Sequence, residues 1–286
     1  MSNKRAHAIV LTVMVALLAG CGVVGLPPAT ATPTSPPTAT ETPTEAPATI
    51  APTEPGPGAS PTAPLARPWE AIAIQQPAPG STVASPLRVE GVADPTFEQH
   101  LGLRLYRMTG ELLAEGSAII EAPLGERGPF AGELTFETDQ QGPALLQVYN
   151  TSARDGGLTH LSSVSVTLSP SGEGQIQQIE VGPEQIAIEE PAEGAVLTGG
   201  VVQVSGIGQA SFEGTLVVEV LNAEGQVIGQ QPLIVDQPEM GEPGPFQVEV
   251  SYQADSAGPG RVVVYDPSPA FDGIIHLNSV GVELQP

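Results

Sequence analysis

The sequence predicts an all-β protein in which two antiparallel β-sandwiches follow one another along the chain. Apolar and polar residues alternate with a period of two over short segments, which is typical of strands with one buried face. The 33 glycines and 31 prolines among 286 residues favour turns over helices. The pattern of the first part of this region returns in the second part, which indicates that one domain is present twice.

Lys4 and Arg5, near the start of the chain, are followed by an apolar run from Ala8 to Ala19. A run of this length fits the core of an export signal and is too short to span a bilayer. It ends in Leu18-Ala19-Gly20-Cys21, which resembles the lipobox of bacterial lipoproteins. The resemblance implies a signal peptide over residues 1–20 and a lipid anchor on Cys21. It also implies a location on the extracytoplasmic face of the cell membrane. The alternative is an ordinary cleaved signal with a chance cysteine.

Residues 21–67 contain the cysteine and then a segment rich in proline and threonine. Between Pro27 and Pro64 almost no residue is both large and apolar. Such a segment cannot offset the entropy that ordering would cost. We therefore expect a disordered stalk that carries the folded part away from the membrane.

The remainder repeats with a period of about 115 residues. The matched motifs keep their order: Pro77–Gly80 with Pro191–Gly194, Gly91 with Gly206, Phe97-Glu98 with Phe212-Glu213, Gly110 with Gly225, Gly128-Pro129-Phe130 with Gly244-Pro245-Phe246, and His160-Leu161 with His276-Leu277. We place one domain at residues 68–170, a linker rich in glycine and glutamine at 171–182, and a second domain at 183–286.

Each copy contains about seven short runs with strand character. In the first copy they start near Ile72, Leu87, Leu101, Leu112, Phe130, Ala144 and Leu161. This spacing is typical of two packed antiparallel sheets. We expect Phe97 and Phe212 to lie in the two cores. The neighbouring Glu98 and Glu213 then each need a partner, either an arginine such as Arg104 or backbone N–H groups.

The repeated motifs together resemble the immunoglobulin-like domain of bacterial spore germination proteins and other exported lipoproteins. They are the Pro-x-x-Gly turn, the strand that ends in glycine, the Phe-Glu pair, the Gly-Pro-Phe strand start, and the loops Asp155-Gly156 and Asp272-Gly273. The resemblance covers both repeats. It implies two tandem immunoglobulin-like sandwiches that act as a non-catalytic extracellular module. The other domain type that usually accompanies this domain in germination lipoproteins is not found beside the two copies.

The chain is strongly acidic, with a formal net charge of −23. Such a surface repels phosphate backbones, so we expect no nucleic-acid partner. The second copy from Glu173 onward carries a net charge of −16, against −7 for residues 68–170. A calcium-dependent surface module is an alternative, although no Asp-x-Asp-x-Asp-Gly loop is present.

The sequence contains no nucleophile elbow, zinc-protease motif or phosphate-binding loop. We therefore predict that the protein is not an enzyme, with a hydrolase as a remote alternative, and assign no catalytic residue, cofactor or metal. The repeated His160 and His276 each have an aspartate nearby, Asp155 or Asp272. One histidine with one aspartate makes a poor zinc site, because zinc takes three or four protein ligands. We expect each histidine to anchor a loop by hydrogen bonding to its backbone.

The loop from Asp266 to Gly273 is the candidate contact surface, with Asp266, Phe271, Asp272 and Gly273 as candidate binding residues. Two prolines stiffen it, and Phe271 either forms its tip or packs back on the sheet. The sequence thus favours a membrane-anchored binding or adhesion module for cell-wall glycan or an envelope protein. The alternative is an architectural spacer without a dedicated ligand.

Overall fold

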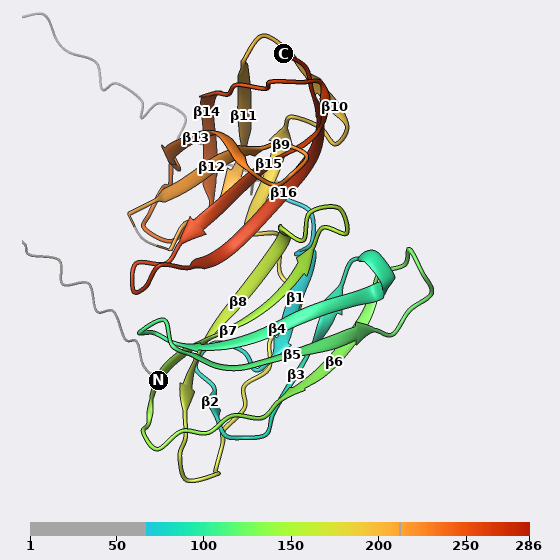
Figure 1. Ribbon diagram of the computed structural model, residues 1–286. Coiled ribbons are helices and arrows are strands. Elements are labelled where there is room, and N and C mark those ends of the chain that lie inside the picture. Colours follow the sequence, from blue (N-terminus) through green and yellow to red (C-terminus); the bar gives the residue numbers. More distant parts are fainter. Residues whose placement is uncertain (1–66, 212) are drawn as a thin grey trace, which may run out of the picture. The chain divides into compact units, whose positions relative to one another are not determined.

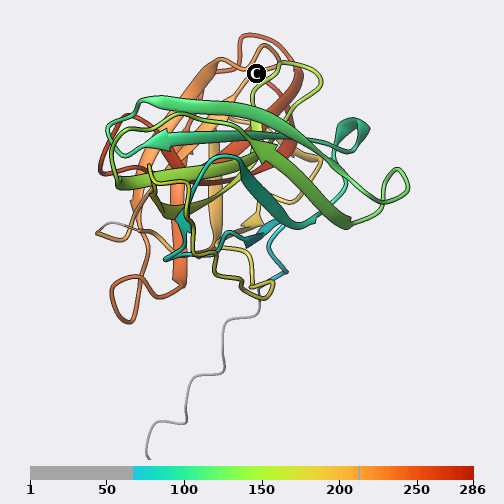
Figure 2. The same cartoon turned by 90° about the horizontal axis from the view of Figure 1, so that it is seen from below.

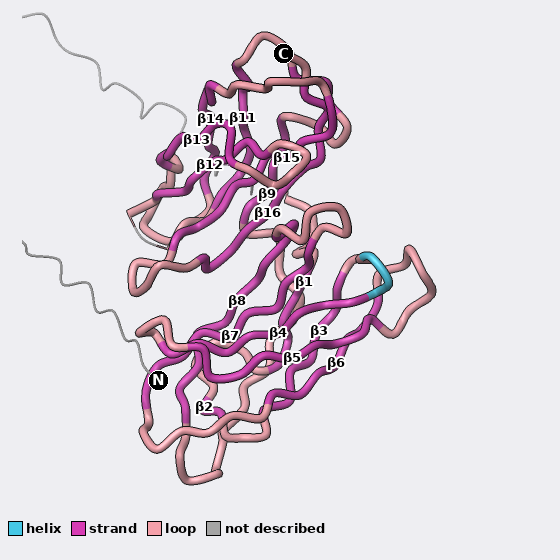
Figure 3. Tube along the Cα trace, in the orientation of Figure 1, coloured by secondary structure: helices cyan, strands magenta, loops and turns pink. Residues whose placement is uncertain are grey.

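A computed structural model of the chain describes residues 67–211 and 213–286, which belong to one compact unit, Pro61–Pro286. The predicted signal peptide, Cys21, nearly all of the stalk and Phe212 lie outside the described residues. The described part is almost entirely β, as the sequence predicts. The exception within it is one short helical turn, η1 (Phe97–Gln99), which is cyan in Figure 3. None of the described helices is long and apolar enough to cross a membrane.

The first sandwich contains the strands drawn in cyan to yellow-green in Figures 1 and 2. They are β1 (Ile72–Gln76), β2 (Thr82–Val83), β3 (Leu87–Ala93), β4 (His100–Arg107), β5 (Leu112–Ile120), β6 (Gly128–Leu134), β7 (Gly142–Thr151) and β8 (Leu158–Leu168). They pair in the order β1-β3-β6-β5-β4-β7-β8, with β2 alongside β8. Alternate side chains of these strands form one apolar core around Phe130.

The second sandwich contains the strands drawn in yellow to red. They are β9 (Ile186–Glu190), β10 (Ala195–Leu197), β11 (Val201–Gly208), β12 (Thr215–Leu221), β13 (Val227–Ile234), β14 (Gly244–Ser251), β15 (Gly258–Pro267) and β16 (Ile274–Leu284). One sheet has the order β14-β11-β9 and the other β16-β15-β12-β13, with β10 beside β16. A second core around Phe246 lies between these sheets.

The predicted strands correspond to observed strands that start within a few residues of the expected positions. The matched glycines Gly110 and Gly225 lie in the turns from β4 to β5 and from β12 to β13, and both have the positive φ of a tight turn, +88° and +75°. The sequence reading missed β2 and β10. Strands of two and three residues are too short to show an alternating pattern.

The prediction that Phe97 lies in the core is wrong, because its surface is 64% exposed. Phe97 opens the turn η1, in which Glu98 and Gln99 have φ of 55°, and this turn breaks the inward–outward alternation of a strand. The buried residue of the turn is Gln99, whose Nε2 donates to the carbonyls of Pro123 and Glu126, each at 3.1 Å. Gln99 therefore fixes the turn onto the loop between β5 and β6.

Arg104, one of the two kinds of partner considered for Glu98, does not pair with it. Arg104 donates from Nε to Glu115 Oε1 at 2.9 Å and lies over the ring of Tyr149. Glu98 and its equivalent Glu213 are both exposed and therefore need no buried partner.

The two sandwiches are joined through their last strands. β8 and β16 pair antiparallel through Leu161 with Leu277 and His160 with Asn278, so one sheet continues from the first sandwich into the second (Figure 1). A third apolar cluster covers this junction and consists of Tyr149, Leu161, Leu221, Val263 and Leu277. The linker runs back along the first sandwich, where Ala78 N–H donates to Gln177 O and Ile179 N–H donates to Gln75 O.

Candidate functional site

The junction has a local two-fold symmetry that relates the two repeats. Leu161 and Leu277 occupy equivalent positions in the repeats and pair directly with one another, as do Trp69 and Pro183. The N–H of Glu70 donates to Gly182 O at 3.0 Å, and the N–H of the equivalent Glu184 donates to Pro68 O at 2.8 Å. Equivalent surfaces therefore face each other, as in the isologous interface of a homodimer.

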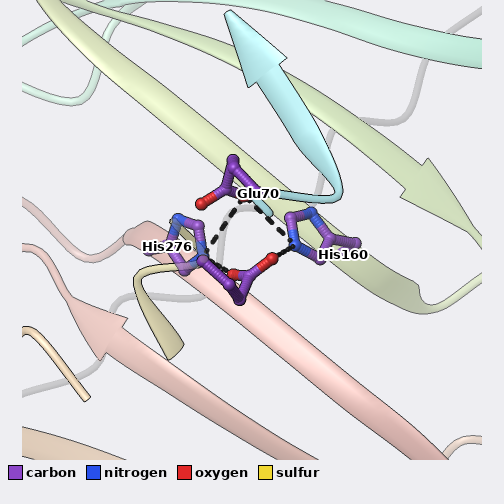
Figure 4. Close-up of side chains that lie close together, drawn as sticks. Glu70, His160 and His276 are labelled. Carbon is purple, nitrogen blue, oxygen red and sulfur yellow. Dashed lines mark hydrogen bonds and ion pairs between the residues drawn. The ribbon is translucent and has the colours of Figure 1, made fainter. Parts of the chain in front are cut away.

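Four polar side chains lie buried on this axis, and we call them the junction cluster: Glu70, His160, Glu184 and His276. Each repeat supplies one glutamate, just before its first strand, and one histidine, on its last strand. Figure 4 shows the two imidazoles pointing toward a common centre with Glu70 beside them. One donor atom from each side chain lies within 4.8 Å of all the others.

The distances in the junction cluster run between imidazole nitrogens and carboxylate oxygens. His160 Nε2 lies 3.1 Å from Glu184 Oε2 and 3.3 Å from Glu70 Oε1. His276 Nε2 lies 2.8 Å from Glu184 Oε1 and 3.8 Å from Glu70 Oε1. The rings meet edge to face with their centroids 5.4 Å apart. Both Nε2 atoms thus face the same two carboxylates.

Backbone N–H groups orient the two carboxylates in a symmetric way. Ala71 N–H donates to Glu184 Oε2 at 3.0 Å, and the equivalent Gln185 N–H donates to Glu70 Oε2 at 3.2 Å. The hydroxyl of Ser162 adds a bond to Glu70 Oε1 at 2.8 Å. Each glutamate is therefore held by the backbone of the opposite repeat.

The charge states of the cluster are set by burial and by mutual attraction. Burial raises the pKa of Glu70 and outweighs the opposing effect of the two histidines. Burial opposes ionisation of Glu184 as well, but hydrogen bonds with both histidines outweigh it and lower the pKa of Glu184. Burial would lower the pKa of His276, but the facing carboxylates outweigh it and raise that pKa. These donor types can share protons or hold a metal ion.

The other ring nitrogens lack partners. The Nδ1 atoms of His160 and His276 are buried and have no hydrogen-bond partner among residues 67–211 and 213–286. The expectation that these histidines anchor loops by backbone hydrogen bonds is therefore wrong. Their hydrogen bonds go through Nε2 to a glutamate.

Comparison with known families gives the identity of the repeated domain. The family described as the immunoglobulin-like domain of bacterial spore germination matches residues 71–157 and again 185–273. The two matches cover more than half of the chain. The chain belongs to this family. The predicted resemblance and the two tandem immunoglobulin-like domains are thereby confirmed.

The other comparisons add little. None of the curated proteins matches this sequence. Among solved structures, the crystal structure of red sea bream transglutaminase is 8% identical, with a TM-score of 0.27. The match covers 76% of this chain and 31% of that chain, and at this TM-score it carries no argument about fold or activity.

The candidate binding residues of the second immunoglobulin-like domain have different surroundings. Asp266 is 1% exposed, and its Oδ2 accepts the Ser211 N–H at 2.9 Å. Phe271 is half-buried and stacks on Tyr106 of the first domain with ring centroids 5.8 Å apart. Asp272 is exposed, and Gly273 lies beside it under the Phe271 ring. Of these four residues, Asp272 is the one that offers a free polar side chain to solvent.

The equivalent loop of the first domain makes the reciprocal contact. The side chains of Asp155 and Arg261 are 2% and 4% exposed, and Arg261 Nη2 donates to Asp155 Oδ2 at 2.6 Å. Burial would raise the pKa of Asp155, but the hydrogen bonds from Arg261 and the Gly157 N–H outweigh it and lower the pKa to about 2. Each domain thus places the loop before its last strand against the other.

Sequence reasoning singled out both histidines of the junction cluster but neither glutamate. Glu70 precedes Ala73 by three residues, and Glu184 precedes Ala187 by the same interval. Both glutamates are thus repeated at the same distance from the motif that begins at Ala73 and at Ala187. This repetition could have identified the glutamates from the sequence, although only the folded chain shows that they contact the histidines.

Proposed function

We propose that this protein is a lipoprotein anchored through Cys21 on the extracytoplasmic face of the cell membrane, where it presents two joined immunoglobulin-like domains to cell-wall glycan. The family membership supports a surface module related to those of spore germination proteins. The lipobox resemblance and the Pro/Thr-rich segment support the anchor and the spacing from the membrane.

The observation that carries the binding proposal is a hollow beside the Asp266–Gly273 loop. It has a volume of about 450 Å³ and combines apolar residues such as Leu221 and Val263 with the polar side chains of Glu219, Tyr265 and Asp272. The hydroxyl of Tyr265 donates to Glu219 Oε1 at 3.2 Å. Burial and the nearby Glu219 carboxylate raise the pKa of Tyr265 to about 12, so its hydroxyl keeps its proton.

These groups suit a sugar chain. Sugars present hydroxyl groups to carboxylates and apolar ring faces to aromatic and aliphatic side chains, and ligand sites in general combine apolar walls with a few fixed polar groups. The loop is held at both ends, by Asp266 on Ser211 and by Phe271 on Tyr106. A loop fixed on a sandwich in this way is well placed for recognition.

The test is co-sedimentation of residues 61–286 with purified cell-wall sacculi at increasing salt. We expect saturable, salt-tolerant retention that Asp272→Ala weakens. Asp255→Ala is the matched control, because Asp255 is an exposed aspartate in the loop between β14 and β15, away from the hollow. Absence of saturable retention would contradict glycan binding. Crosslinking on whole cells would then distinguish between two alternatives: binding to an envelope protein, and an architectural spacer without a ligand.

The anchor is tested separately by metabolic labelling with a fatty-acid analogue. We expect label on the wild-type protein and none on Cys21→Ala, since the proposed modification needs the thiol. Label on the variant would contradict lipidation at this cysteine.

A further inference from the structure

We propose that the junction cluster binds one Zn²⁺ ion, which fastens the two immunoglobulin-like domains to each other. This inference goes beyond surface display and does not depend on it. It rests on the geometry, burial and charge of the four side chains.

The spacing of the donor atoms fits a tetrahedral zinc site. Zinc bonds to imidazole nitrogen and carboxylate oxygen are about 2.0–2.2 Å long, which separates tetrahedral ligands by about 3.3–3.5 Å. The four nitrogen–oxygen distances in the cluster run from 2.8 to 3.8 Å and involve both oxygens of Glu184. One donor atom from each of the four residues can be chosen so that all lie within 4.8 Å of one another. An ion at the common centre would therefore draw the donor atoms together by up to about 1 Å.

The charge balance also favours a divalent cation. The side chains of Glu70 and Glu184 are 10% and 2% exposed, and two buried carboxylates require compensation. Protons can supply it by charging both imidazoles, but two positively charged rings would then lie with their centroids 5.4 Å apart in a buried site. A single Zn²⁺ supplies both positive charges at one point and leaves the rings neutral. Burial of a neutral N–H costs less than burial of part of an imidazolium.

The neighbouring strands offer acceptors for the Nδ1–H groups that zinc-bound histidines carry. His276 is directly paired with Asp266 of β15, whose buried Oδ1 has no partner in the described part of the chain. His160 is paired in the same way with Asn150 of β7. Directly opposed residues have Cβ atoms about 5 Å apart, so Asp266 and Asn150 lie beside the two rings, although neither Nδ1 has a hydrogen-bond partner in the described part of the chain. Histidine ligands commonly donate their second N–H to such a partner.

The donor set selects among metals. Two imidazoles and two carboxylates in a tetrahedron suit zinc, whereas calcium requires six to eight oxygens and magnesium an octahedron of oxygens. Four protein ligands fill a tetrahedral site, which is typical of structural zinc. A small pocket of about 170 Å³ is lined by Glu70 together with Ser162 and Gly182, so one ligand of the cluster borders a hollow.

The first experiment measures zinc in residues 61–286 after removal of metal with a chelator and reconstitution. We expect one tightly held Zn²⁺ per chain by mass spectrometry of the metal. We also expect the visible absorption of tetrahedral Co²⁺ when cobalt replaces zinc. Zinc should raise the melting temperature, because it binds the folded chain only.

Variants then assign the ligands. Glu184→Gln keeps the size of the side chain, and His276→Ala removes a ring, and both should abolish stoichiometric zinc and the cobalt spectrum. His100→Ala is the matched control, because His100 is exposed on β4. Asp266→Asn should weaken zinc binding about 10–100-fold through His276. Circular dichroism checks that each variant keeps its β structure.

Two results would overturn the proposal. One is wild-type protein, folded by circular dichroism, that retains no zinc and gives no cobalt spectrum. The other is a folded Glu184→Gln or His276→Ala variant that binds zinc as tightly as wild type. In either case protons, and not a metal ion, balance the charge of the two glutamates.

Discussion

At the scale of single residues, Asp155 and Arg261 show how the two domains hold each other. Asp155 lies in the loop before β8 and Arg261 lies on β15, so their ion pair crosses from the first domain to the second. Arg261 is the one basic residue of the chain after Glu173. Its guanidinium is buried and is paired with the Asp155 carboxylate.

Asp155→Asn is expected to destabilise residues 61–286 by about 3 kcal/mol, because a buried charge is left without its partner. Chemical denaturation at neutral pH measures this loss. Glu90→Gln is the control, since the Arg88–Glu90 pair is exposed and should contribute less than about 1 kcal/mol. Equal effects of the two substitutions would contradict a special role for the buried pair.

The same pair predicts a dependence on pH. The pKa of Asp155 is about 2 in the folded chain, below the value of about 3.9 in an unfolded one. Its stabilisation is therefore fully present above about pH 4 and is lost as the pH falls toward 2. The difference in unfolding free energy between wild type and Asp155→Asn should shrink over this window, and a constant difference would contradict the assignment.

At the scale of elements, Gly91 and Gly206 each lie two residues before the end of a strand, β3 or β11, so the strands expected to end in these glycines continue beyond them. A Cβ on Gly91 would collide with the carbonyl oxygen of Ala73 and come within 2.7 Å of the Phe130 ring. Gly206 meets Ala187 and Phe246 in the same way. The edge strands β1 and β9 can approach β3 and β11 only where a side chain is missing.

Gly91→Ala is therefore expected to destabilise the protein by about 1–3 kcal/mol, because β1 or the Phe130 ring must move. Gly142→Ala is the control, since nothing lies within 4 Å of its Cβ position and its φ is not positive. Denaturation with urea measures both. A Gly91→Ala protein as stable as the control would show that the contact relaxes freely.

At the scale of the whole molecule, the apolar cluster at the junction couples two domains that each have a core of their own. Leu161 and Leu277 are 1% and 3% exposed and pair across the local two-fold axis. Burial of both leucines and of the junction cluster predicts that residues 61–286 unfold as one cooperative unit.

Leu277→Asp should break this coupling while leaving both separate cores intact. We expect the single calorimetric transition of the wild type to split into two. The loss at the junction should be about 2–5 kcal/mol, the usual cost of removing a buried leucine. Leu124→Asp is the control, because Leu124 is 81% exposed. A single unchanged transition for Leu277→Asp would mean that the junction carries no stability.

The sequence by itself determined the fold class, the duplication and the approximate starts of the longer strands along the chain. Period-two alternation and turn glycines act over a few residues, so they can be read without knowledge of distant contacts. The same local reading misplaced Phe97, because the positive φ of Glu98 and Gln99 reverses the pattern within one turn. Local rules therefore fail where the backbone leaves the strand region.

Only the tertiary structure decided that the two domains join through β8 and β16 and that four polar residues meet there. Each domain taken alone holds one glutamate and one histidine of the junction cluster. The junction cluster exists only when the two copies face each other across the two-fold axis. Residues 70 and 276 lie at opposite ends of the folded region. The alternation of apolar and polar residues within one repeat gives no information about contacts between the repeats. Each repeat supplies one glutamate and one histidine, and packing of one domain on the other brings the four side chains together.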